Sequence, residues 1–146
     1  MSDPLYKKEL LRLAADATGA GRLDQPDAAA MVSNPACGDR VRVELQLKDG
    51  RIAALAHQAQ ACVLTQASAA ILAGGAPGRS PAEIAALADS VRAMLAGAGN
   101  PGPPFDAYGV FDGVATHAGR HRCVMLPLEA ALKALSEASE PGGKGP

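Results

Sequence analysis

The sequence predicts an α+β domain in which a small antiparallel sheet, built around a hairpin, packs against several helices. Residues 41–47 alternate strictly between apolar and polar side chains, the pattern of a half-buried strand. Asp49-Gly50 follows, which is typical of a two-residue hairpin turn, and residues 51–58 return as a second strand. Segments with helical periodicity precede and follow this hairpin, so helices and sheet are segregated along the chain.

Five further segments are expected to be helical, because their apolar residues recur at helical spacing or because a capping box opens them at Ser80. In chain order they are residues 4–18, 63–73, 81–96, a short piece near 106–112, and 124–138. Residues 97–104 are expected to form a loop, and Pro127 is tolerable only in the first turn of the last helix. We expect one domain over residues 1–138 and a disordered C-terminal tail over 139–146.

The two-residue turn sets a register for the hairpin. Lys48 then lies opposite Arg51, and counting outward from the turn places Val43 opposite Ala56. The apolar residues of both strands fall on one face in this register, which supports it. The same register places His57 on the solvent-side face, as an ordinary surface residue.

Extending this register beyond the strands predicts a meeting of chemically active residues. An unbroken ladder would put Cys37 opposite Cys62, with Asp39 opposite Gln60 on the same face. Pro35 and strand twist interrupt such a ladder, so proximity is the expectation rather than strict pairing. Cys37, Asp39 and Cys62 are therefore predicted to converge at the end of the hairpin away from its turn.

Composition excludes several classes of protein. The formal charge of −1 argues against a general binder of polyanions, and nucleic acid would need a local basic patch. Only 3% of the residues are aromatic and none is Trp, so stacking platforms for bases or sugars are scarce. No run of residues approaches the length of a membrane span, and the N-terminus lacks the pattern of a signal peptide. We expect a cytoplasmic protein with neither nucleic-acid nor membrane partners.

Cysteine is the residue type that carries the candidate chemistry. Cys37, Cys62 and Cys123 make an odd count, which in a reducing compartment disfavours a disulfide framework. Cys62 and Cys123 each immediately precede a predicted helix, and helix N-termini and neighbouring cations favour thiolates. Three thiolates and the carboxylate of Asp39 make a four-donor shell that suits Zn²⁺ or an iron–sulfur cluster.

Plainer alternatives stay open on the residues alone. Three buried core cysteines without a shared function are common in proteins. His121, two residues before Cys123, is an alternative fourth ligand or the base of a Cys/His hydrolase, although no glycine-rich oxyanion motif accompanies it. His117 is expected to be solvated in a loop. Arg120 and Arg122 either balance the negative charge of a metal site or are ordinary surface charges.

Three motifs resemble those of the U-type iron–sulfur cluster assembly scaffolds, the IscU, SufU and NifU N-terminal family. Residues 34–39 (NPACGD) resemble the NPxCGD motif of this family. Residues 62–69 resemble its second-cysteine segment, Cys-x-x-Ser/Thr-x-Ala-Ser, and residues 122–130 resemble the start of its third-cysteine helix. Order, spacing and predicted elements agree with the family from residue 4 to residue 138.

The resemblance implies a SufE/NifU-like fold with about three strands. It assigns Cys37, Asp39, Cys62 and Cys123 as the ligands of a zinc ion or a [2Fe-2S] cluster. The chain resembles the SufU branch most, because Arg122 stands where IscU proteins carry a His before the third cysteine. The long stretch between the second and third cysteines is also SufU-like. The Leu-Pro-Pro-Val-Lys chaperone motif of IscU proteins is missing, so we expect no dedicated Hsp70 partner.

Two functions follow from the resemblance. The first is a scaffold that accepts sulfur from a cysteine desulfurase of the SufS type, binds iron or a transient [2Fe-2S] cluster, and passes it to downstream iron–sulfur acceptor proteins. Asp39 would keep that cluster labile. The alternative is a zinc-dependent sulfur acceptor, a sulfurtransferase that stimulates the desulfurase, with Cys123 as the candidate acceptor. We expect a scaffold or carrier more than an enzyme. A closed structural zinc domain is a further alternative.

Overall fold

The computed structural model places helices and strands in the predicted order and adds one strand. It describes residues 8–36 and 38–139. In chain order the elements are α1 (Lys8–Asp16), β1 (Ala28–Asn34), β2 (Asp39–Lys48), β3 (Arg51–Gln60), α2 (Val63–Gly75), α3 (Pro81–Leu95), the 3₁₀ helices η2 (Asp106–Val114) and η3 (Ala118–Arg120), and α4 (His121–Ser139). An antiparallel sheet with segregated helices confirms the α+β class.

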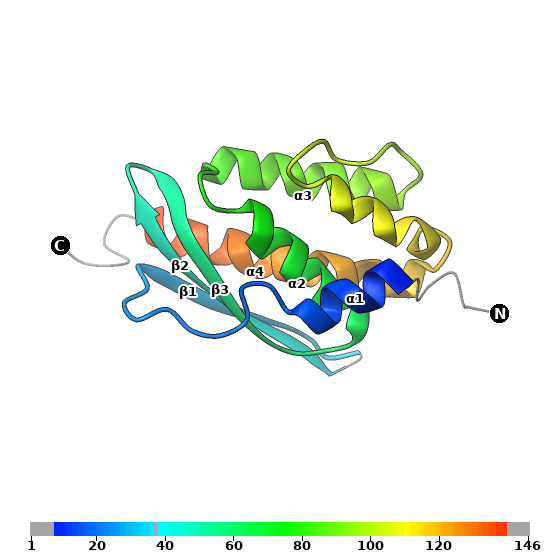
Figure 1. The fold of residues 1–146 in the computed structure, drawn as a ribbon, viewed down its shortest axis with the longest axis horizontal. Helices are drawn as coiled ribbons and strands as arrows, with labels where there is room; N and C mark the ends of the chain where they lie inside the picture. The colour runs from blue at the N-terminus through cyan, green and yellow to red at the C-terminus, as the bar shows by residue number, and fades with distance from the viewer. Residues whose placement is uncertain (1–7, 37, 140–146) are drawn as a thin grey trace.

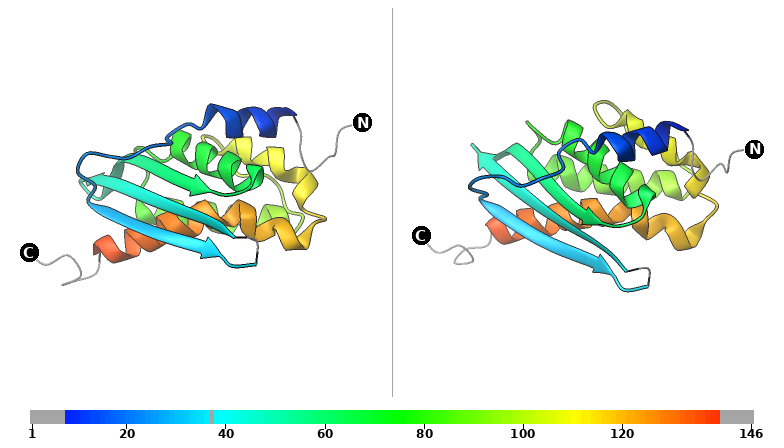
Figure 2. Two further views of the ribbon diagram at one scale, coloured as in Figure 1. Left: turned by 90° about the horizontal axis from the view of Figure 1, so that it is seen from below. Right: turned by 60° about the horizontal axis from the view of Figure 1, so that its bottom comes forward.

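The helices gather on one side of the three-stranded sheet, whose strand order is β1-β2-β3 (Figure 1). Helix α4 packs along β1 and β2, and α2 packs beside α4 and against β3. Helix α1 packs on α2, and α3 packs on α4. The start of β2, the end of β3 and the start of α4 consequently lie at one end of the molecule (Figure 2). No helix of the described residues is both long and apolar enough to cross a membrane.

The predicted hairpin is present, but its register holds only next to the turn. Lys48 pairs with Arg51 as expected, and Asp49 and Gly50 both have positive φ angles, as a type I′ turn requires. A β-bulge then shifts the pairing by one residue, so that Val43 lies opposite His57 rather than Ala56. The predicted register was wrong beyond this point, because an extra residue in one strand moves every later side chain to the other face.

Strand β1 was not located by the sequence patterns. Its sequence, AAAMVSN, has no clean alternation of apolar and polar residues. It pairs with β2 through a tight connection in which Asn34 lies opposite Asp39. Asn34 also orders this connection: its carbonyl accepts from the N–H of Gly38 at 2.9 Å, and its Oδ1 accepts from the N–H of Ala36 at 3.3 Å. The strand thereby fixes where β2 begins.

The helices after the sheet start and end close to the predicted positions, with one exception. The capping box at the start of α3 is confirmed, since Ser80 and Glu83 exchange side-chain and backbone hydrogen bonds. Helix α4 begins at His121, three residues earlier than predicted, because η3 leads directly into it. Cys123 therefore lies inside the helix, and Pro127 lies beyond its first turn.

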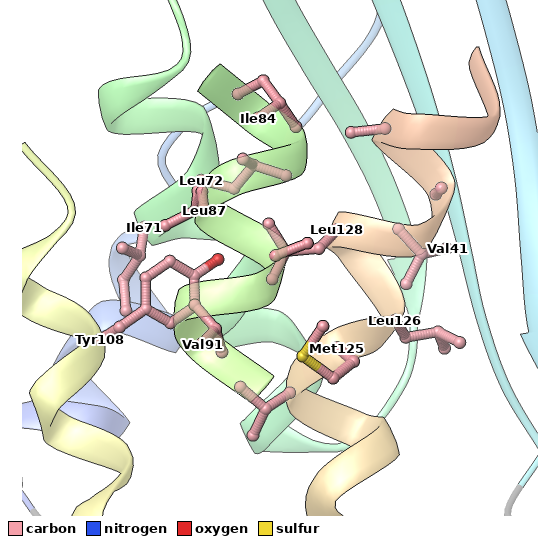
Figure 3. Close-up of a cluster of buried hydrophobic side chains, with 14 of the residues drawn as sticks. Val41, Ile71, Leu72, Ile84, Leu87, Val91, Tyr108, Met125, Leu126 and Leu128 are labelled. Carbon is pink, nitrogen blue, oxygen red and sulfur yellow. The ribbon is translucent and has the colours of Figure 1, made fainter. Parts of the chain in front are cut away.

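Leu, Ile, Val and Ala side chains of α2, α3 and α4 form most of the core, together with Tyr108 of η2 (Figure 3). Helix α2 is buried along most of its length, which explains why it reads as almost continuously apolar. Of the tail predicted to be disordered, residues 139–146, Ser139 is the last residue of α4, and the remainder lies outside the described residues, as does the predicted start of the first helix at residue 4.

Candidate metal centre

Asp39 is the first residue of β2 and is buried, with 6% of its surface exposed. Gly38 precedes it with a φ of +76°, a left-handed conformation that allows the chain to turn sharply into the strand. A buried carboxylate needs hydrogen-bond donors or a cation to offset the loss of water. One oxygen, Oδ1, accepts from the backbone N–H of Cys62 at 3.3 Å. The sharp turn and this bond aim the carboxylate towards the end of β3.

Cys62 is the N-cap residue of α2 and is half-buried. The prediction that it stands at a helix N-terminus is confirmed. Its side chain makes no capping hydrogen bond, so the sulfur is not committed to the backbone of the helix. The Sγ atom lies 3.6 Å from Oγ1 of Thr65, one turn further along α2.

Cys123 lies in the first turn of α4 and is 1% exposed. The expectation that it immediately precedes the helix was wrong by one turn. Its backbone carbonyl accepts from Oγ1 of Thr65 at 2.9 Å, which ties the start of α4 to α2. Ser68, one turn along α2, donates to the carbonyl of Val124 at 2.6 Å in the same way.

These three residues come together in space although they are far apart in sequence. One ligand atom from each of Asp39, Cys62 and Cys123 lies within 4.8 Å of the others. In tetrahedral geometry, Zn–S bonds of about 2.3 Å place neighbouring ligand atoms roughly 3.8 Å apart. A contraction of about 1 Å thus brings all three atoms around one ion. Two sulfurs and one carboxylate oxygen fit zinc or iron in donor type as well as in spacing.

The other sequence-predicted site residues stand as follows. Cys37 lies outside the described residues, so its place as fourth ligand stays a prediction. His121 is not a member of this group, and its Nε2 donates to the carbonyl of Ala115 at 3.0 Å. His117 is exposed, as expected. The exposed guanidinium of Arg122 reaches the carbonyl of Ser33 and a carboxylate oxygen of Glu129, both at 3.4 Å.

His57 differs from its prediction. The bulge in β3 turns it to the helix-covered face, where it is 4% exposed. Its Nε2 donates to the carbonyl of Thr18 at 2.7 Å, and burial lowers the pKa of His57 below its usual range. The neutral ring therefore belongs to the packing of the segment between α1 and β1 against β3.

Sequence reasoning missed Thr65, whose buried hydroxyl touches all three residues of the cluster. The signal was present, because Thr65 follows Cys62 by three residues and so shares its helix face. The hydroxyl also occupies the Ser/Thr position of the second-cysteine segment.

The fold and this cluster define a class: small α+β proteins that hold a cysteine and aspartate donor set where a three-stranded sheet meets two helices. The family described as NifU-like N terminal domain matches residues 5–107. The chain belongs to this family. The predicted resemblance to the U-type scaffolds is thereby confirmed, and the match covers Asp39 and Cys62 but ends before Cys123.

Individual relatives extend the similarity over the rest of the chain. The iron-sulfur cluster assembly scaffold protein IscU of Streptococcus pyogenes is 28% identical over 120 residues, 82% of this chain and 75% of that protein. The protein of the same name from Thermotoga maritima is 23% identical over 94% of this chain and 96% of its own length.

Solved structures share the fold. The N-terminal NifU-like protein of Brucella abortus has a TM-score of 0.87 at 31% identity, covering 92% of this chain and 94% of that one. A SUF-system scaffold, SufU, from Fervidobacterium islandicum has a TM-score of 0.83 at 18% identity, covering 92% and 99%. The second likeness concerns the fold alone.

Proposed function

We propose that this protein is an iron–sulfur cluster assembly scaffold that accepts sulfur from a cysteine desulfurase and binds iron or a transient [2Fe-2S] cluster for transfer. The carrying observation is the cluster of Asp39, Cys62 and Cys123, whose ligand atoms lie within 4.8 Å of one another. Relatives named as iron-sulfur cluster assembly scaffold proteins support the proposal. Cys37, beside Asp39 in sequence, is the proposed fourth ligand.

The donor set suits an iron–sulfur cluster that is bound transiently and then released to another protein. Thiolates hold iron strongly, whereas a carboxylate is a harder and weaker partner for the iron of a sulfide cluster. Asp39 replaces one thiolate of the usual four-cysteine shell and so weakens retention. The cargo would rest where β2, α2 and α4 meet, with Cys62 at the more exposed side and Cys123 at the buried side.

Sulfur uptake would be a thiol exchange at one of these cysteines. A thiolate of this protein attacks the outer sulfur of the desulfurase persulfide and forms a new S–S bond. The S–S bond of the donor breaks, and the desulfurase cysteine leaves as a thiolate with the electron pair. Cys123 is the proposed acceptor, and its 1% exposure means that the first turn of α4 must open for this attack.

The second candidate is a zinc-dependent sulfur acceptor that stimulates the desulfurase. The span of the cluster favours it, since three donors within 4.8 Å fit around a single ion. Bound zinc would hold Asp39 and the thiolates in place and keep the sulfurs deprotonated. Release of one thiolate to a desulfurase would then supply the nucleophile.

The deciding experiment measures metal and acid-labile sulfide in protein purified without oxygen. Iron with matching sulfide supports the scaffold, and one equivalent of zinc without sulfide supports the zinc-dependent acceptor. Cys62→Ser, Cys123→Ser and Cys37→Ser should each abolish tight binding. Asp89→Asn, which changes an exposed carboxylate on α3, is the matched control. Neither metal, even after reconstitution, would overturn both functions.

Sulfur transfer is tested separately with a cysteine desulfurase and cysteine labelled in its sulfur, without a thiol reductant, because a reductant would remove the transferred sulfur as sulfide. Labelled sulfur should appear on the wild-type chain and be lost in Cys123→Ser. Retention of the label in Cys123→Ser, with loss in Cys62→Ser, would move the acceptor role to Cys62.

A further inference from the structure

The side chain of Thr65 contacts each of the three residues of the candidate metal site, Asp39, Cys62 and Cys123. Its Oγ1 atom is fully buried and lies 2.9 Å from the Cys123 carbonyl oxygen, 3.2 Å from Oδ2 of Asp39 and 3.6 Å from Sγ of Cys62. A hydroxyl carries a single hydrogen, so it can donate to only one of these atoms at a time. The neighbours of Thr65 therefore compete for that hydrogen.

Pro127 removes the backbone donor that the Cys123 carbonyl would have in a regular helix. In a regular helix the carbonyl of residue 123 accepts from the N–H of residue 127, but proline has no N–H. Cys123 is buried, and a hydrogen bond to a buried carbonyl is stabilising. The hydroxyl of Thr65, on the neighbouring helix α2, donates a hydrogen bond to this carbonyl.

The carboxylate of Asp39 is the competing acceptor. Its Oδ1 already receives the N–H of Cys62, whereas Oδ2 faces the hydroxyl of Thr65. A cation bound by the carboxylate takes up the negative charge that attracts this hydrogen. The hydrogen is then free to stay on the Cys123 carbonyl.

We propose that Thr65 is a positioning residue that couples cation binding at Asp39 to the attachment of Cys123 on α2. Binding at Asp39 releases the hydroxyl hydrogen to the Cys123 carbonyl, and this bond holds the first turn of α4 in the ligating position. Because coupling is reciprocal, the hydrogen bond from Thr65 to the Cys123 carbonyl also raises the affinity of the three ligand residues for the cation. The proposal rests on the proposed function in so far as the cluster binds a metal.

Thr65→Val tests the proposal because it keeps the shape of the side chain and removes the hydroxyl, while Thr65→Ser keeps the hydroxyl. Ser68→Ala is the matched control. Ser68 lies on the same helix and its buried hydroxyl also donates to a carbonyl of α4, but its partners are Val124 and Tyr108. A merely structural role for hydroxyls of α2 would make Thr65→Val and Ser68→Ala equivalent.

The measurement is a titration of the metal-free protein with Co²⁺, followed through its thiolate charge-transfer and d–d absorption. Thr65→Val should lower the affinity about tenfold and change the d–d bands, as loss of an outer-shell contact does elsewhere. Thr65→Ser and Ser68→Ala should stay within about threefold of the wild type and keep its spectrum. Wild-type affinity and spectrum in Thr65→Val, or an equal loss in Ser68→Ala, would overturn the proposal.

Pro127→Ala provides an independent test because it restores a backbone N–H that can reach the Cys123 carbonyl. In this background Thr65→Val should cost less Co²⁺ affinity than in the wild type. The unfolding of the four metal-free proteins should show the same non-additivity. If wild-type protein fails to bind Co²⁺, the proposed function and the coupling to Asp39 fail together, whereas the contact between Thr65 and Cys123 is judged by unfolding alone. Additive unfolding effects would overturn that contact.

Discussion

Asp39 and Cys62 are joined directly, since the backbone N–H of Cys62 donates to Oδ1 of Asp39 at 3.3 Å. In a capping box, this N–H of the N-cap residue is satisfied by a Glu or Gln in the first turn of the same helix. Here a carboxylate from the start of β2 performs that task for α2. The bond means that Asp39 both orders the start of the helix and belongs to the candidate metal site, so these two roles must be separated by experiment.

Asp39→Ala should leave a reconstituted cluster more persistent, with iron loss to a chelator slowed about fivefold. Removal of the hard carboxylate lets a softer thiol from the buffer complete the shell, and thiolates retain iron of a sulfide cluster better. The rate of bleaching of the cluster absorption under chelator measures this. Faster loss than in the wild type would contradict the role given to Asp39.

Asp39→Asn is the companion variant, because its amide oxygen can still accept the N–H of Cys62. Loss of that acceptor in Asp39→Ala should cost about 1–2 kcal/mol of unfolding free energy in the metal-free protein, and Asp39→Asn should cost less. Equal losses in both variants would show that the bond to Cys62 contributes little to stability.

Cys62 and Cys123 should differ in chemical reactivity. Cys62 is half-buried and Cys123 is 1% exposed, so iodoacetamide should modify Cys62 at least about tenfold faster in the metal-free protein. Peptide mapping by mass spectrometry after timed quenching gives both rates in one sample. Zinc added beforehand should protect both cysteines. Equal rates without metal would mean that the first turn of α4 opens freely.

The sequence predicted the proximity of Asp39 and Cys62 better than it predicted the strand pairing between them. The alternating strand and the Asp49-Gly50 turn fixed a hairpin whose far end brings Asp39 near Cys62, and this convergence is what the structure shows. The strand pairing used to reach it was wrong, because a bulge leaves no mark in the alternation of apolar residues. Proximity survived because a shift of one residue moves the chain by only a few ångströms.

Other features depended on contacts between distant segments. His57 appears on the polar face of an ideal hairpin, and only the bulge turns it inward. Strand β1 lacks alternation because α4 covers one face of a sequence that is mostly small and apolar. Pro127 favoured a late start for the last helix, yet α4 starts at His121, and the hydroxyl of Thr65, distant in sequence, donates to the carbonyl of Cys123.

The free energy of unfolding should decrease as the pH is lowered through a window set by His57. Burial lowers the pKa of His57 in the folded protein, so between that lowered value and the ordinary value of 6.5 the unfolded chain binds more protons. Stability then rises with pH through this window, by up to about 1.4 kcal/mol per pH unit for one proton, and is lost as pH falls. His57→Gln keeps a donor for the Thr18 carbonyl and removes the titration.

Chemical denaturation of both proteins from pH 7.5 down to pH 5 tests this. The stability advantage of wild type over His57→Gln should shrink as the pH falls below 6.5. Taking the difference cancels the carboxylates that titrate in both proteins. A difference that is constant across this range would contradict a neutral, buried His57.

Gly74 and Gly75 at the end of α2 should respond oppositely to alanine. A Cβ at Gly75 would lie 2.5 Å from the ring of Phe105, which packs against this part of the helix. Gly75→Ala should therefore lower the unfolding free energy by about 1–3 kcal/mol. A Cβ at Gly74 meets only a methyl group of Thr18, at 4.0 Å, so Gly74→Ala should raise it by about 0.5–1 kcal/mol through better helix propensity.

Gly74→Ala and Gly75→Ala also test whether Phe105 anchors residues 97–118, which lie between α3 and α4, against helix α2. Phe105 is buried, and the loop before it carries no other large apolar side chain. Phe105→Ala should remove the clash, so Gly75→Ala should be less destabilising, or even stabilising, in that background, while Gly74→Ala keeps its effect. Thermal unfolding of the single and double variants measures the coupling. Helix α2 follows its N-cap residue Cys62 and ends at Gly75, beside Phe105. If Gly75→Ala displaces the ring of Phe105 but leaves the Co²⁺ affinity unchanged, the two ends of the helix act independently.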